Sequence, residues 1–344
     1  MADDKVPPMS NQADYDLPEG AKPLKTWSYL ASNKRRPSEY EVVSTRLFYN
    51  RDDPDRPWAI GLNQPLNVWY RKYANGSPLS HDAWDDFRDP DQMTYRAYTV
   101  IQDGQENYVD GLIEHNAGIG DDKEYPDDWT QTLASLYAPS RYLLHSVQMT
   151  SSYLFHMAPA STIGICSAFQ AGDQLRWVAR TAYRTVELAN NRPGFGFNEN
   201  ERAHWEDDEA WQGFRELMEK ILVAYDWGET FTSLCLVAKP AIDEAIFRQL
   251  GNTARTQGDS LLSLLAEAAL RDSDRSRRWA GELVRFLQEK DGNQKHLDDW
   301  VAKWEPLADA AIECYCAALP DSEGAGDAAK RDTRIFRKSL GLSA

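Results

Sequence analysis

The residues that could bind a metal are few and widely separated in this sequence. Helical bundles can hold two iron ions between carboxylates and a pair of Glu-x-x-His motifs, because residues three positions apart project into the same side of a bundle. The chain has 344 residues and six histidines, and only His204 follows a glutamate at this spacing, in Glu201-Arg-Ala-His204. One motif cannot supply a paired site. Its acidic surroundings, Trp205-Glu-Asp-Asp208, favour a solvated surface instead.

The other chemically capable residues form no recognisable site. The sequence has no His-Glu-x-x-His string, Walker loop, Gly-x-Ser-x-Gly string or dinucleotide fingerprint. Its four cysteines are irregularly spaced, and Cys314-x-Cys316 lacks the spacing of redox or zinc sites. We therefore expect reduced thiols, with neither a catalytic residue nor a metal site in this chain.

The elements that carry these residues are predicted to be helices. Apolar residues recur near the 3.6-residue period of a helix, and almost no stretch alternates with the period of a strand. The pattern predicts helices over residues 92–115, 128–138, 140–157, 161–188, 209–249, 260–289 and 294–318. Pro240 should kink the fifth of them, because proline removes a backbone donor. The predicted fold class is all-α, a bundle of long helices.

Composition divides the chain into four parts. Residues 1–23 are predicted to be disordered, 24–88 an extended aromatic arm rich in proline, 89–320 the helical domain, and 321–344 a polar C-terminal tail. The arm's prolines prevent long helices, yet its aromatic side chains must be buried. It packs either on a partner subunit or back onto its own domain. The candidate interface residues in the arm are Trp27, Tyr29, Arg35, Arg36, Tyr40, Trp58 and Trp69.

Charge and composition exclude several kinds of partner. The chain has 38 Lys and Arg against 54 Asp and Glu, which gives a net charge of −16. Such a chain repels polyanions, so we expect it to bind neither nucleic acid nor an anionic membrane. It contains no apolar run of membrane-spanning length and no N-terminal signal region, which predicts a soluble cytoplasmic protein. Twelve Trp and sixteen Tyr suit broad buried surfaces, in a core or between subunits.

Specific strings between residues 24 and 320 resemble a known family. They are Lys25-Thr-Trp-Ser-Tyr-Leu-Ala31, Arg36-Pro-Ser-Glu-Tyr-Glu-Val-Val-Ser44, Asp89-Pro-Asp-Gln92, Gln102-Asp-Gly-Gln-Glu106, Ala158-Pro-Ala-Ser-Thr162, Thr181-Ala-Tyr-Arg-Thr185, Trp211-Gln-Gly-Phe-Arg-Glu-Leu217 and Lys303-Trp-Glu-Pro-Leu-Ala-Asp309. Together they closely resemble the β subunit of bacterial multicomponent monooxygenase hydroxylases. The most similar branch is that of toluene, xylene, benzene and alkene monooxygenases.

This resemblance implies a ferritin-like fold and a non-catalytic structural role. It implies an α₂β₂γ₂ hydroxylase whose di-iron centre lies in the partner α subunit, with no cofactor in this chain. We expect the aromatic arm, over residues 24–60, to lie across that α subunit. The complex would insert one oxygen atom of O₂ into an aromatic or alkene hydrocarbon. Its electrons would come from NADH through a reductase and a Rieske ferredoxin, and a small effector protein would dock on it. Two alternatives stay open, an independent ferritin-like enzyme and a stand-alone helical scaffold.

The resemblance also marks four degenerate ligand positions. Where the α subunit carries Asp-Glu-Leu-Arg-His, this chain has Asp173-Gln-Leu-Arg-Trp177, so Gln174 and Trp177 replace Glu and His. Amide and indole groups cannot replace these ligands. The second motif, Asp-Glu-Ser-Arg-His, is matched to Ser273-Asp-Arg-Ser-Arg277, which places Asp274 and Arg277 at ligand positions.

Glu229, in Trp227-Gly-Glu-Thr-Phe-Thr232, lies near a further ligand position of the family. We interpret it as a buried carboxylate that is hydrogen-bonded or paired with an arginine, because an unpaired buried charge is costly.

Overall fold

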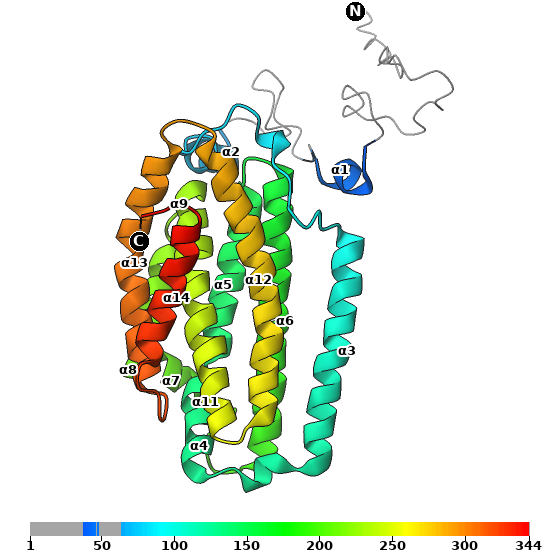
Figure 1. Cartoon of the computed structure of the whole chain (residues 1–344), viewed down its shortest axis with the longest axis vertical. Coiled ribbons are helices and arrows are strands. Elements are labelled where there is room, and N and C mark those ends of the chain that lie inside the picture. Colours follow the sequence, from blue (N-terminus) through cyan, green and yellow to red (C-terminus); the bar gives the residue numbers. More distant parts are fainter. Residues whose placement is uncertain (1–36, 46, 48–62, 344) are drawn as a thin grey trace, which may run out of the picture.

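Long helices that run alongside one another form the body of the molecule (Figure 1). The computed structural model describes residues 37–45, 47 and 63–343, and it contains no strand in these ranges. The main helices are α3 (Tyr95–Ile119), α5 (Ser140–Met157), α6 (Ser161–Asn191), α12 (Ser260–Gln288) and α13 (Asn293–Ala317). The predicted all-α bundle is confirmed.

Shorter elements complete the bundle. Between α3 and α5 lie η3 (Asp121–Glu124), α4 (Asp127–Thr132) and the π-helical η4 (Leu133–Tyr137), and between α6 and α8 lies α7 (Glu201–Asp207). Helices α5 and α6 pack closely against each other, because only Ala158, Pro159 and Ala160 separate them. Figure 1 shows α3 at the edge of the bundle, beside α6 and α12.

The run predicted as one helix over residues 209–249 is divided in the structure. Helix α8 (Glu209–Ile221) ends at a turn, and α9 (Trp227–Phe231) starts where the Asp226 carboxylate accepts hydrogen bonds from the amides of Gly228 and Glu229. An N-cap of this kind satisfies donors that the helix itself cannot. The run continues through η5 (Thr232–Ala238), α10 (Lys239–Ile242), η6 (Asp243–Gln249) and α11 (Leu250–Thr256). Both η5 and η6 are π-helical, and Pro240 lies between them.

Aromatic side chains fill the core of the bundle. Trp129, Trp211 and Tyr315 are fully buried, and each donates its polar hydrogen within the chain. The acceptors are the Asp259 carboxylate for Trp129, the Ser135 carbonyl for Trp211 and the Leu136 carbonyl for Tyr315. A buried aromatic ring removes about 150–250 Å² from water, and satisfying its polar atom avoids the cost of burying that atom. Much of the aromatic content therefore stabilises this chain's own core.

The described parts of the arm fold onto the bundle. They include α1 (Glu39–Ser44), α2 (Pro65–Tyr73) and η2 (Trp84–Asp86). Tyr40 is 4% exposed and its hydroxyl accepts a hydrogen bond from the Asp89 amide. Trp69 donates to the Tyr153 hydroxyl at 3.0 Å and packs edge-on against the ring of Tyr225.

Two of the interface candidates thus contact their own chain, and their contact with a partner stays a prediction. The contacts of Tyr40 and Trp69 agree with the alternative prediction, in which the arm packs back onto its own helical domain. The physical reason is that the bundle offers each polar atom a hydrogen-bond partner next to an apolar surface. The other candidates, Trp27, Tyr29, Arg35, Arg36 and Trp58, lie outside the described residues.

The helical bundle extends beyond residue 320. Residues 321–344, predicted as a polar tail, contain helix α14 (Ala325–Ser339), which packs on α13. The Arg337 guanidinium is buried and donates to the Glu305 carboxylate of α13 at 2.6 Å. Within the described ranges, none of the helices combines the length and the apolar character needed to cross a lipid bilayer.

Candidate functional site

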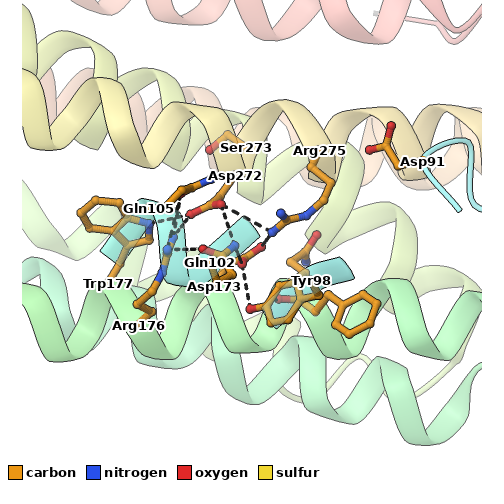
Figure 2. A network of polar contacts seen from close by, with 12 residues as sticks. Asp91, Tyr98, Gln102, Gln105, Asp173, Arg176, Trp177, Asp272, Ser273 and Arg275 are labelled. Atoms are coloured by element: carbon orange, nitrogen blue, oxygen red, sulfur yellow. Dashed lines mark hydrogen bonds and ion pairs between the residues drawn. The ribbon is translucent and has the colours of Figure 1, made fainter. Parts of the chain in front are cut away.

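A buried cluster of charged side chains joins α6 and α12. Figure 2 shows its two carboxylates, Asp173 from α6 and Asp272 from α12, lying between two arginines. The pairing is reciprocal: Arg275 of α12 binds Asp173, and Arg176 of α6 binds Asp272. Arg275 also lies 3.5 Å from the second oxygen of Asp272. Two negative and two positive charges therefore compensate one another in the interior.

Helix α3 closes this cluster on its outer side. The Gln102 amide donates to Asp173 at 2.9 Å and to Asp272 at 3.1 Å, while its carbonyl oxygen accepts from Arg176. The Tyr98 hydroxyl donates to Asp173 at 3.0 Å. These contacts bind α3 to the bundle through polar groups.

The electrostatics of the cluster depend on burial. Loss of water around Asp173, with the nearby charge of Asp272, raises the pKa of Asp173 to about 7, although Arg275 and Arg176 act in the opposite direction. Burial also disfavours the charged form of Arg275, but Asp173 and Asp272 outweigh this and raise its pKa. The Tyr98 pKa is raised, first by burial and then by Asp173, so the phenol remains a hydrogen-bond donor.

The reciprocal pairs correct the predicted register of the second motif. They match Asp173 with Asp272 and Arg176 with Arg275. The α12 segment equivalent to Asp173–Trp177 is therefore Asp272–Ser276, which begins one residue before the predicted Ser273–Arg277. Asp274 is exposed on α12. One residue turns a helix by about 100°, which explains why a shift of one changes the side on which a residue lies.

In this register, the α12 residues equivalent to Gln174 and Trp177 of α6 are Ser273 and Ser276. Both serines are buried. Arg277, predicted at the imidazole position, instead pairs with Glu244 of η6 at 2.8 Å.

A second charged pair lies in the interior beside Ser273. Lys239 is 2% exposed and Asp243, one turn later in the same helical run, is 0% exposed. Their side chains form an ion pair, and the Lys239 ammonium also donates to the Ser273 hydroxyl at 3.1 Å. Sequence analysis did not single out this pair. The usable signal was a lysine and an aspartate four residues apart in an otherwise apolar run, the spacing of a helical ion pair.

The comparisons with known proteins agree on one family. A family model described as Methane/Phenol/Alkene Hydroxylase matches residues 69–291, more than half of the chain. The chain belongs to this family. It is 48% identical over 301 residues to the toluene-4-monooxygenase system, hydroxylase component subunit beta, of Ectopseudomonas mendocina, covering 88% of this chain and 92% of that one. The predicted resemblance to hydroxylase β subunits is therefore confirmed.

The fold agrees with the sequence match. A solved structure of toluene 4-monooxygenase with toluene bound in its resting active site contains a chain that superposes with a TM-score of 0.83 and 47% identity. The match covers 87% of this chain and 98% of that one. A more distant relative is the oxygenase component subunit alpha of the alkene monooxygenase system of Xanthobacter autotrophicus, 23% identical over 232 residues, which are 66% of this chain and 46% of that one.

The interior residues of this hydroxylase-family chain do not suit a di-iron centre. Gln174 is neutral, and the Trp177 indole has no lone pair to donate and itself donates to Asp272 at 3.0 Å. Lys239 places a cation next to Ser273, where a metal ion would be repelled. Across residues 37–45, 47 and 63–343, no three His, Cys, Asp or Glu side chains are grouped to hold a metal ion. We therefore derive no reaction step through iron in this chain.

The remaining predicted residues serve local structure. Glu201 is buried, not solvated as predicted, because its carboxylate accepts from the Asn198 amide and lies 3.6 Å from Arg141. His204 is partly buried, and its Nδ1 lies 2.6 Å from the Asp208 carboxylate. Glu229 is hydrogen-bonded, as expected, but by Lys303 at 2.6 Å and Trp304 at 3.1 Å instead of an arginine.

Proposed function

We propose that this chain is the non-catalytic, structural β subunit of the hydroxylase component of a multicomponent monooxygenase. The complex oxidises an aromatic or alkene hydrocarbon with O₂ and electrons derived from NADH. The observation that carries the proposal is a buried interior whose side chains do not suit a di-iron centre, namely Gln174, Trp177 and the Lys239–Asp243 ion pair. The 48% identity to a hydroxylase subunit beta supports the same role.

In this proposal the chemistry belongs to a partner chain. The di-iron centre lies in the α subunit, and α, β and γ subunits assemble as α₂β₂γ₂. A small effector protein, a Rieske ferredoxin and an NADH reductase contact the assembled hydroxylase. This chain contributes a rigid bundle whose charged interior is balanced by its own residues, and it supports the α subunit through a large permanent interface, which in obligate complexes buries about 2,000–5,000 Å².

Metal analysis of the purified complex tests the proposal. We expect one di-iron centre for each αβ pair, bound in α. A variant at a degenerate ligand position of this chain adds a second test. Gln174→Ala should leave both the iron content and the hydroxylation activity of the complex unchanged. A second iron centre for each αβ pair, or loss of iron in the Gln174→Ala complex, would contradict the proposal.

A further inference from the structure

The outer side of α6 carries an uncharged face that this chain leaves uncovered. Its inner positions, among them Gln174 and Trp177, are buried in the bundle. On the opposite side, Leu175, Tyr183 and Val186 are 53%, 55% and 48% exposed. Isolated exposed apolar residues are common on proteins, but several on one face of one helix are typical of an interaction surface.

The spacing of this face is that of a helix-packing seam. Apolar or small residues recur at alternating intervals of four and three positions, and we call this set the α6 seam. It consists of Ala168, Gly172, Leu175, Ala179, Ala182, Val186 and Ala189. A 3.5-residue repeat keeps one face turned toward a neighbouring helix that crosses at about 20°, as in coiled coils.

This chain covers the α6 seam only in part. Its ends are partly covered: a Cβ at Gly172 would come within 2.7 Å of the Tyr98 hydroxyl, and Ala189 packs against the core. At its centre, Leu175, Ala179 and Val186 are exposed and Ala182 is partly buried. From Ala168 to Ala189 the seam is about 32 Å long at 1.5 Å per residue. Only a long helix can follow it throughout.

Charges at its edge limit what can bind there. Arg180 of α6 pairs with Glu106 and Asp110 of α3, so the acidic side of α3 lies along this edge. Asp103 and Glu114 extend that side and are exposed. Two copies of this chain packed seam to seam would bring two acidic edges together on chains that each carry a net charge of −16. A different chain with basic residues beside its apolar stripe fits better.

We propose that the α6 seam is the docking surface for a long helix of the partner hydroxylase α subunit. This inference rests on the proposed function. The occupant has the length that the seam requires, since an α subunit of this family matches 66% of this chain and is therefore expected to share its long helices. Small residues at Ala179 and Ala182 allow close approach of that helix, and Leu175 and Val186 supply apolar anchors.

The test introduces a charge at the centre of the seam in the co-expressed hydroxylase. Ala179→Glu should reduce the amount of α recovered with affinity-tagged β at least tenfold. Ile335→Glu is the matched control, because Ile335 is 57% exposed on α14, on the other side of the bundle from α6 (Figure 1). It should leave recovery at the wild-type level. Circular dichroism of both tagged chains should show unchanged helix content.

A photo-crosslinking residue in place of Tyr183 identifies the occupant. We expect cross-links to a helix of α, located by mass spectrometry of the purified complex. Cross-links to a second copy of this chain, to γ or to the effector would overturn the proposal. Wild-type recovery of α with Ala179→Glu would also overturn it, whereas failure of wild-type β to recover any α would refute the proposed function instead.

Discussion

Two sets of buried charges in this protein are balanced. Asp173, Asp272, Arg176 and Arg275 form one set, and Lys239 with Asp243 forms another. Removing one member of such a set leaves a charge without a partner in a medium of low dielectric, which typically costs about 3–5 kcal/mol. Replacing both members by apolar groups of similar size is often nearly neutral. The individual residue therefore matters mainly through its partner.

The Lys239–Asp243 pair allows a direct test of this balance. Lys239→Met should lower the free energy of unfolding by about 3–5 kcal/mol, because Asp243 then lacks its cation. The double variant Lys239→Met/Asp243→Leu should regain most of the loss. Lys295→Met, in an exposed pair with Asp299, should change stability very little. Denaturant unfolding measures all three, and a double variant as unstable as the single one would refute the explanation.

The Asp173 carboxyl predicts a pH dependence of stability. Its pKa is raised to about 7 in the folded chain, against about 3.9 for an unfolded aspartate, so the folded state binds more protons between these values. Stability should therefore fall as pH rises from about 4 to 7, and level off above that. Tyr98, Arg176, Asp272 and Arg275 surround this carboxyl.

Asp173→Asn should remove this contribution. The comparison is the unfolding midpoint of wild type and variant at a series of pH values from about 5 to 8. We expect the wild-type curve to fall more steeply with pH than the variant curve. Parallel curves would show that Asp173 does not titrate in this range.

Whole elements differ in how far the sequence determines them. Helix α5 matches its predicted range of 140–157, because Pro139 and Pro159 mark both ends. The break between α8 and α9 was not predicted, since the apolar stripe continues past Leu222 and hides the capping signal of Asp226. The register of α12 was misplaced by one residue because Asp and Arg occur twice within Asp272–Arg277. Only the spatial pairs distinguish them.

Helix α14 shows a different limit of the sequence pattern. Its buried face consists of Ala329, Thr333 and Arg337, at intervals of four residues, and two of these are polar types that a hydropathy pattern assigns to solvent. Burial of Arg337 depends on Glu305, which is distant in sequence. Contacts between remote segments of this kind cannot be read from local periodicity.

Arg337→Met should therefore destabilise the chain by about 2 kcal/mol through loss of a charge-assisted hydrogen bond to Glu305. The effect should be moderate, because Arg334 still donates to the same carboxylate at 3.0 Å. Arg331→Met on the exposed side of α14 is the control and should be neutral. Thermal unfolding of the two variants decides; equal midpoints would mean that α14 is not held by this contact.

At the scale of the whole molecule, the acidic surface and the aromatic arm concern assembly. Tyr40 and Trp69 contact this chain's own bundle, so the predicted contact of the arm, over residues 24–60, with α is tested on the part of the arm that precedes them. Deletion of residues 24–36 should reduce the recovery of the assembled hydroxylase and its activity together. Size-exclusion chromatography and a hydroxylation assay measure both. A deletion complex that is assembled and fully active would show that this part of the arm is dispensable.

The ammonium group of Lys239 differs from a metal ion in how it reaches the interior. It is covalently attached, so the centre of the bundle is charge-balanced as soon as the polypeptide has folded. An iron centre, by contrast, must be loaded from outside, and its completion depends on iron supply and on the redox state of the cell. Under the proposed function, with the di-iron centre in the α subunit, folding of this subunit would not depend on iron delivery, and it could serve as an assembly platform before its partner is loaded.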